Sequence, residues 1–124
     1  MSNQDLNSIL KEFQSEISSL QATAIIGGDG LVVAELIKDR DIDMELVGAQ
    51  MSLLMTLVKK VSSRFNTEPE ENLLSTENGY MLVTFLGKNF MHGVVVPKDG
   101  GLAATRLAMR DYAERLSRAL ASSI

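Results

Sequence analysis

Few side chains in this sequence could carry out chemistry, and the first to consider is the single histidine. His92 lies in an apolar run, residues 90–96, where strand alternation puts it on one face with Phe90 and Val94. An imidazole can act as a base or bind a metal, but a metal site needs further ligands, and the chain has no second histidine and no cysteine. No acidic residue lies beside it in the run. We therefore expect a core or rim histidine, no catalytic residue and no metal site.

Two glycine-rich segments raise the question of phosphate or cofactor binding. Residues 27–30, Gly-Gly-Asp-Gly, lack the lysine and the serine or threonine that complete a phosphate-binding loop, and Val33 replaces the third glycine of a dinucleotide-binding fingerprint. A tight turn between two strands accounts for them. Residues 99–101, Asp-Gly-Gly, precede a helical pattern, and Asp99 is expected to cap that helix. The sequence therefore predicts no cofactor and no enzyme.

Composition excludes several other classes of function. The chain has 124 residues, 45% of them hydrophobic and 23% charged, which is typical of one globular domain spanning residues 1–124. A net charge of −4 provides no basic surface for nucleic acid or for anionic lipid. The longest uncharged stretch, residues 46–58, is too short for a membrane span. With no cysteine and no signal-peptide pattern, we expect a cytoplasmic protein that does not insert into membranes.

Hydrophobic periodicity and turn residues predict eight elements. Their predicted order is αββαβββα, with helices over residues 6–20, 41–65 and 102–121, and strands over residues 22–26, 31–36, 72–76, 80–86 and 90–96. Short turns within each group of strands predict a five-stranded, mostly antiparallel sheet. The last two strands are apolar at nearly every position, whereas a strand with one solvated face would alternate. We therefore expect an α+β fold of three layers, with helices on both faces of the sheet.

The long central helix carries more apolar surface than a sheet needs to cover. One stripe is predicted to pack on the sheet, and it consists of Met44, Val47, Met51, Leu54, Val58, Val61 and Phe65. A second stripe lies roughly 100° away around the helix, and it consists of Leu46, Leu53 and Leu57, flanked by Gln50, Lys60 and Arg64. The second stripe indicates a second buried contact, most simply with another copy of this helix. The alternative is that the first helix or a loop of the same chain covers it.

The first strand of the last group, residues 72–76, is expected to form an edge of the sheet. It contains no lysine or proline, the residues that commonly block an edge from pairing. We therefore expect this strand, including Leu73 and Ser75, to extend the sheet across a dimer.

Several local motifs, in this order, resemble the Roadblock family, which is named for a dynein light chain. Residues 24–34, Ala-Ile-Ile-Gly-Gly-Asp-Gly-Leu-Val-Val-Ala, are similar to the first two strands of that family and their turn. Residues 77–83 and 86–90 resemble its central strands, and residues 100–103 with Arg106 resemble the entry to its last helix. The similarity covers nearly the whole chain.

The resemblance implies a fold in which two subunits pair through the long helix and the third strand. Stand-alone prokaryotic members, the mutual-gliding regulators among them, often partner a small Ras-like GTPase. The function implied is that of a non-catalytic homodimeric regulator, with Leu46, Gln50, Leu53 and Leu57 on the dimer or partner surface and Lys60 and Arg64 at its rim. Two alternatives stay open: a purely structural adaptor and, with less support, a small-molecule sensor, which needs a cavity with convergent polar groups.

Overall fold

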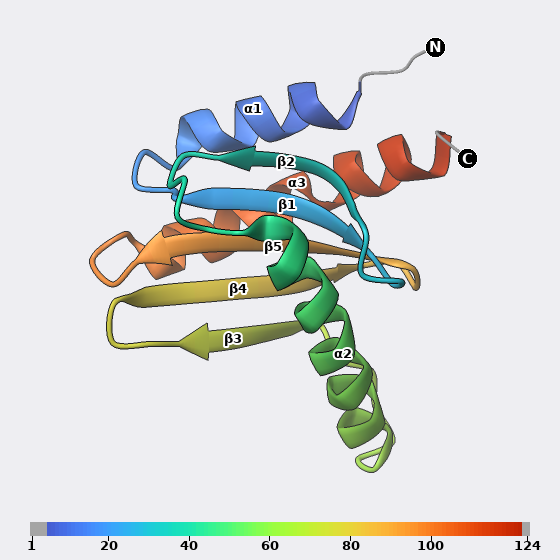
Figure 1. Ribbon diagram of the computed structural model, residues 1–124. Coiled ribbons are helices and arrows are strands. Elements are labelled where there is room, and N and C mark those ends of the chain that lie inside the picture. The colour runs from blue at the N-terminus through green and yellow to red at the C-terminus, as the bar shows by residue number, and fades with distance from the viewer. Residues whose placement is uncertain (1–4, 123–124) are drawn as a thin grey trace.

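A computed structural model describes residues 5–122 and contains the eight predicted elements in the predicted order (Figure 1). The elements are α1 (Leu6–Glu16), β1 (Ala22–Gly27), β2 (Val32–Ile37), α2 (Met44–Ser63), β3 (Glu71–Ser75), β4 (Gly79–Leu86), β5 (Phe90–Pro97) and α3 (Leu102–Ser122).

The five strands form one sheet in the order β2-β1-β5-β4-β3, and every neighbouring pair is antiparallel. The two hairpin groups meet in the middle of the sheet, where β1 pairs with β5. The edges are β2 and β3, so the expected edge position of β3 is confirmed. Helices α1 and α3 cover one face and α2 crosses the other (Figure 1), which confirms the predicted three layers.

Each face of the sheet has its own core. The core under α1 and α3 is centred on Phe13, Leu82, Met109 and Leu116, all fully or almost fully buried. The core under α2 is rich in methionine and contains Met44, Met51, Met55, Met81 and Met91. Methionine is unbranched and fills irregular gaps, which suits a helix that crosses the strands obliquely.

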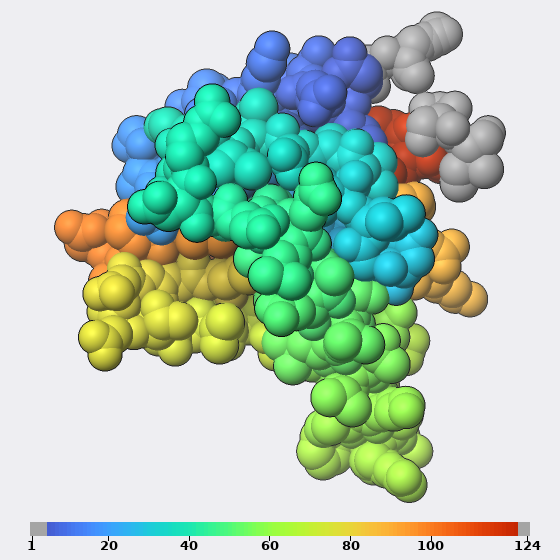
Figure 2. All heavy atoms as spheres, viewed as in Figure 1, coloured from blue at the N-terminus to red at the C-terminus, as the bar shows by residue number. Residues whose placement is uncertain are grey.

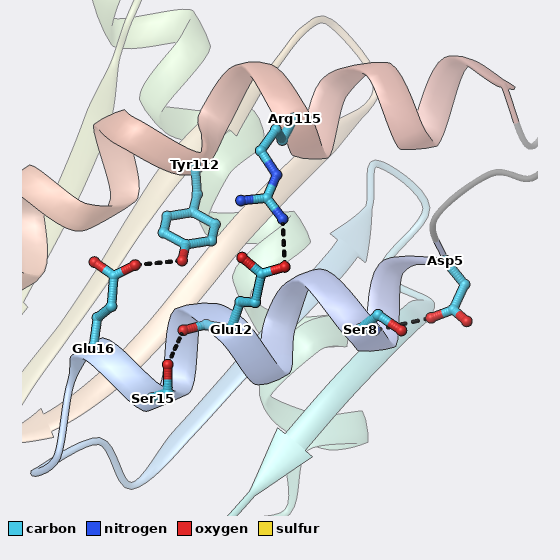
Figure 3. Close-up of polar contacts among 7 residues, drawn as sticks. All are labelled: Asp5, Ser8, Glu12, Ser15, Glu16, Tyr112 and Arg115. Atoms are coloured by element: carbon cyan, nitrogen blue, oxygen red, sulfur yellow. Dashed lines mark hydrogen bonds and ion pairs between the residues drawn. The ribbon is translucent and has the colours of Figure 1, made fainter.

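Polar contacts fix α1 against α3 (Figure 3). The Tyr112 hydroxyl donates a hydrogen bond to the Glu16 carboxylate, and Arg115 Nη2 lies 2.9 Å from Glu12 Oε1.

Asp5 caps α1 by accepting a hydrogen bond of 2.9 Å from the Ser8 amide. The helix ends at Glu16 rather than near residue 20 as predicted, because the amide of the next residue bonds to Gln14 three residues back.

The glycine turn is structural, as expected. Residues 28–31 connect β1 to β2, and Gly30 has a positive φ of 90° that side chains rarely adopt. A Cβ atom at Gly30 would lie 3.1 Å from the Cα of Ala49 in α2. A glycine of the helix also permits this close approach, since a Cβ at Gly48 would lie 3.2 Å from the Gly30 carbonyl oxygen. The two glycines therefore allow α2 to pack closely on the turn.

The prediction that Asp99 caps the last helix is wrong. Helix α3 begins at Leu102, so the residue before it is Gly101, which has a positive φ of 79°. The Thr105 amide bonds to the Gly101 carbonyl oxygen at 3.0 Å, and the Thr105 hydroxyl bonds to the same oxygen at 3.0 Å. Asp99 lies two residues too early in the chain to reach the capping position.

Candidate functional site

The histidine is a core residue, as predicted from its strand. His92 is fully buried, with its Nε2 atom 2.9 Å from Thr23 Oγ1 and its ring centroid 4.9 Å from that of Phe13. The Thr23 hydroxyl donates its proton to the Gly93 carbonyl oxygen at 3.1 Å, so it accepts one from His92 Nε2. The Nδ1 atom is buried without a hydrogen-bond partner. Burial lowers the pKa of His92 to about 3, so the neutral ring is the stable form in the fold.

Residues 5–122 contain neither a cluster of candidate metal ligands nor a helix able to cross a membrane. This part of the chain contains no group of three or more histidine, aspartate or glutamate side chains placed to hold a metal ion. Over the same residues, no helix is long and apolar enough to cross a membrane.

Helix α2 is rotated relative to the predicted orientation, so only Met44, Val47, Met51 and Val58 of the predicted stripe pack on the sheet. Its buried residues are Met44, Gly48, Met51 and Met55, with Val47 and Val58 half-buried. Three residues assigned to the inward stripe, Leu54, Val61 and Phe65, are instead 36%, 56% and 73% exposed. The helix is rotated toward Gly48 because the absent side chain there allows close packing on the hairpin. It also spans Met44–Ser63 rather than residues 41–65, starting after an Asp43 cap.

One flank of α2 is polar and tied to the turns at one end of the sheet. Ser52 Oγ donates to the Gly28 carbonyl oxygen at 2.6 Å, and Lys59 Nζ donates to the Lys88 carbonyl oxygen at 3.2 Å. The Lys59 ammonium also lies 5.1 Å from the centre of the Phe85 ring. These contacts fix the rotation of the helix, so its opposite flank faces away from these turns.

That opposite flank is apolar and open to solvent. At about 100° per residue, Leu54, Leu57 and Val61 lie on the side of the helix opposite Ser52 and Lys59. Leu57 is 57% exposed. Leu46 and Leu53 point more directly away from the sheet. We call Leu54, Leu57 and Val61 the apolar flank, and Leu46 and Leu53 the outer face; Gln50 lies between Leu57 and Val61 around the helix.

The residues predicted for the interaction surface on α2 all lie exposed on one side of the molecule. This set consists of Leu46, Gln50, Leu53, Leu57 and Lys60 in the helix and Arg64 directly after it. In Figure 2 the end of α2 stands out from the body of the protein.

The two residues predicted on β3 are exposed, but they lie on the face of the sheet that α1 and α3 cover, opposite the face that α2 crosses. Leu73 pairs with Leu82 and Ser75 with Tyr80, and both partners belong to the α1 and α3 side. Leu74 pairs with Met81, which lies under α2. Leu74 is 45% exposed and shares the face of the sheet with the apolar flank, and the sequence prediction missed it.

The strand β3 is an open edge of the sheet. It pairs with β4 over all five of its residues, Glu71–Ser75, and has no strand on its other side in the sheet formed by residues 5–122. The end of α2 lies at the β3 end of the strand order (Figure 1), so we take the apolar flank and the β3 edge together as one candidate interaction surface.

Comparison with known proteins agrees with this architecture. The model of the Roadblock/LC7 domain matches residues 7–95, so the chain belongs to the Roadblock/LC7 family. Helix α3 lies outside the matched range, although the fold includes it.

Solved structures with the same fold come from several bacteria. MglB of Myxococcus xanthus matches with a TM-score of 0.86 at 11% identity, covering 94% of each chain. The gliding protein MglB of Thermus thermophilus matches with a TM-score of 0.83 at 15% identity, over 90% of this chain and 85% of that one. A Roadblock/LC7 domain of Streptomyces avermitilis matches with a TM-score of 0.84 at 17% identity, over 94% and 98%. No curated protein sequence matches the chain.

Proposed function

We propose that this protein is a non-catalytic homodimer that regulates a small Ras-like GTPase. Membership of the Roadblock/LC7 family supports the proposal, as does the resemblance to stand-alone prokaryotic members that partner such GTPases. The observation that carries it is the run of exposed apolar side chains on α2, because a helix of a monomer normally shows polar residues there.

The proposed dimer uses the apolar flank of α2 together with the β3 edge. Leu54, Leu57, Val61 and Leu74 are 36–57% exposed, so burying each contributes roughly half of the about 1.5–3 kcal/mol that a fully exposed side chain would give. Four such side chains on each subunit reach the scale of the association cost, which is about 4–15 kcal/mol. Backbone hydrogen bonds between two β3 strands would add to this and set the orientation of the subunits. Leu73 and Ser75 would border the same strand pairing from the other face.

The outer face of α2 is the surface that we assign to the GTPase. Leu46 and Leu53 point away from the sheet, beyond Leu57 at the border of the apolar flank. They stay accessible when Leu54 and Val61 are paired, whereas Gln50 lies beside Leu57 on the flank itself. Lys60 and Arg64 border this face. Two such helices side by side would form a platform against the switch regions of a GTPase and favour their hydrolysis-competent state, without supplying an arginine finger.

A nucleotide-dependent capture experiment tests the functional proposal. Tagged protein would be incubated with lysate of the native host, once with a non-hydrolysable GTP analogue and once with GDP. We expect a small GTPase to be retained with the GTP analogue, and single-turnover hydrolysis with the purified pair then measures stimulation. Retention in both states would favour the purely structural adaptor, and the absence of any small GTPase would refute the regulatory proposal.

Substitution of the outer face tests which surface is used. We expect Leu53→Asp to weaken GTPase binding while the protein keeps its fold, because Leu53 is 71% exposed. Leu107→Asp is the matched control, since Leu107 is 61% exposed but lies on α3, across the sheet. Equal partner affinity for the two variants would show that the outer face of α2 is not the partner site.

A further inference from the structure

The face of the sheet under α2 is only partly covered by that helix. Beside the first half of α2 lies an open groove of about 350 Å³. Apolar side chains of the α2-side core line it, namely Ile42, Val47, Met81 and Val95, and Asn78 in the β3–β4 turn stands at its mouth. The groove lies on the same side of α2 as the apolar flank, because Val47 lines it.

The last part of α2 extends past its own sheet and carries two exposed apolar side chains among its polar ones. The last buried residue of the helix is Met55. Val61 is 56% exposed, and Phe65, which follows the helix, is 73% exposed, more than any other large apolar side chain among residues 5–122. The seven residues from 59 to 65 extend about 10 Å, which equals about two strand spacings. In Figure 1 this end lies beyond β3.

Two-fold symmetry at the β3 edge relates these two features. The end of α2 and the β3–β4 turn lie at opposite ends of that edge (Figure 1). An axis perpendicular to the sheet beside β3 pairs two copies of this strand antiparallel and keeps both α2 helices on one face. The same rotation moves the projecting end of α2 across about two strands of the neighbour. It then lies over β4, at the end where the β3–β4 turn and the groove are found.

We propose that the groove is completed only in the dimer, by Val61 and Phe65 of the partner subunit. This inference rests on the dimer proposed above and adds a specific reciprocal contact to it. Each subunit inserts its α2 end into the groove of the other, so the dimer contains two identical contacts. The contact covers an exposed phenylalanine and an open apolar groove together, and each of these would otherwise leave apolar surface in water.

Cross-linking tests the contact directly, since the native chain has no cysteine. The double variant Phe65→Cys with Asn78→Cys would be treated with a short bismaleimide and separated on a denaturing gel. We expect a covalent dimer. The single variant Phe65→Cys is one control. The other combines Phe65→Cys with Glu114→Cys, which places the second thiol on α3, across the sheet. Neither control should cross-link efficiently.

The oligomeric state of the native protein, which keeps Phe65, separates the two proposals. A native dimer by light scattering, together with a double variant that fails to cross-link more than the controls, would overturn the groove contact and leave the dimer intact. A monomer would overturn the dimer and the contact with it.

A second measurement does not depend on added thiols. Phe65→Ala should raise the dissociation constant of the dimer by about tenfold or more, as expected for removal of an aromatic anchor from an interface. The fold should be unaffected because the side chain is exposed within its own subunit. Leu107→Ala is the control and should leave the dissociation constant unchanged. Equal constants for the two variants would contradict the proposal.

Discussion

Acidification should destabilise this protein through one buried side chain, His92. Its ring is fully buried, with one nitrogen bonded to Thr23 and the other, Nδ1, left without a partner. Protonation would place a charged N–H donor at Nδ1 in apolar surroundings, where Phe13 packs against the ring. This is the physical reason that burial lowers the pKa of His92 to about 3 in the folded state.

The sign and size of the effect follow from linkage. The folded pKa lies below the unfolded value of 6.5, so the unfolded chain takes up a proton first as the pH falls. Stability from this residue is therefore complete above about pH 6.5 and is lost progressively as the pH falls toward 3. Between pH 7.5 and 5.5 the loss amounts to about 1.4 kcal/mol, or about tenfold in the folding equilibrium.

Urea denaturation at fixed protein concentration measures this loss. The window from pH 7.5 to 5.5 lies above the usual pKa range of carboxylates, and the variant His92→Gln, which cannot titrate, provides the baseline. We expect the free energy of unfolding of the native protein to fall by about 1.4 kcal/mol more than that of the variant. Because the chain has one histidine, its ring NMR signals should also stay constant from pH 8 to 5. Equal pH slopes, or a ring that titrates near pH 6.5, would refute the reasoning.

Two further predictions concern contacts that hold the helices in place. Asp43→Ala should destabilise the protein by about 1 kcal/mol in a denaturation experiment, since the Asp43 carboxylate caps α2 by accepting a hydrogen bond of 3.2 Å from the Leu46 amide; no change would show that the cap is dispensable. Tyr112→Phe should cost about 1.5 kcal/mol or more through its lost bond to the Glu16 carboxylate. Burial and the Glu16 carboxylate raise the pKa of Tyr112 to about 12, so absorbance titration of the native protein should show an ionisation near pH 12 that the variant lacks.

The order of the elements could be predicted from the sequence because each signal is local. The periodicity of residues 6–16, the glycine turn before Val32 and the apolar strands 79–86 and 90–97 depend on neighbours in the chain. The last two strands are apolar at nearly every position, and this was also sufficient to predict helices on both sides of the sheet. The prediction of an Asp99 cap was wrong because two glycines in succession allow the chain to turn before the helix begins.

The orientation of α2 could not be predicted from apolar spacing alone. A side chain buried in the monomer and one reserved for a partner look the same in a sequence, so Leu54, Val61 and Phe65 were assigned to the sheet. The deciding residue is Gly48, whose missing side chain lets the helix approach the hairpin. Likewise, the register between β3 and β4 decides that Leu74, and not Leu73, lies on the α2 face of the sheet. The apolar pattern of the strand does not reveal this register.

The mass of the protein in solution tests the central claim most directly. Sedimentation equilibrium should give twice the chain mass of 13.5 kDa for the native protein. Leu57→Asp, which places a charge on the apolar flank, should shift the equilibrium toward the single-chain mass, while the exposed control Leu107→Asp on α3 should remain a dimer. A native protein that sediments at 13.5 kDa, or a Leu57→Asp variant that pairs as tightly as the control, would contradict the assignment of this flank as the dimer surface.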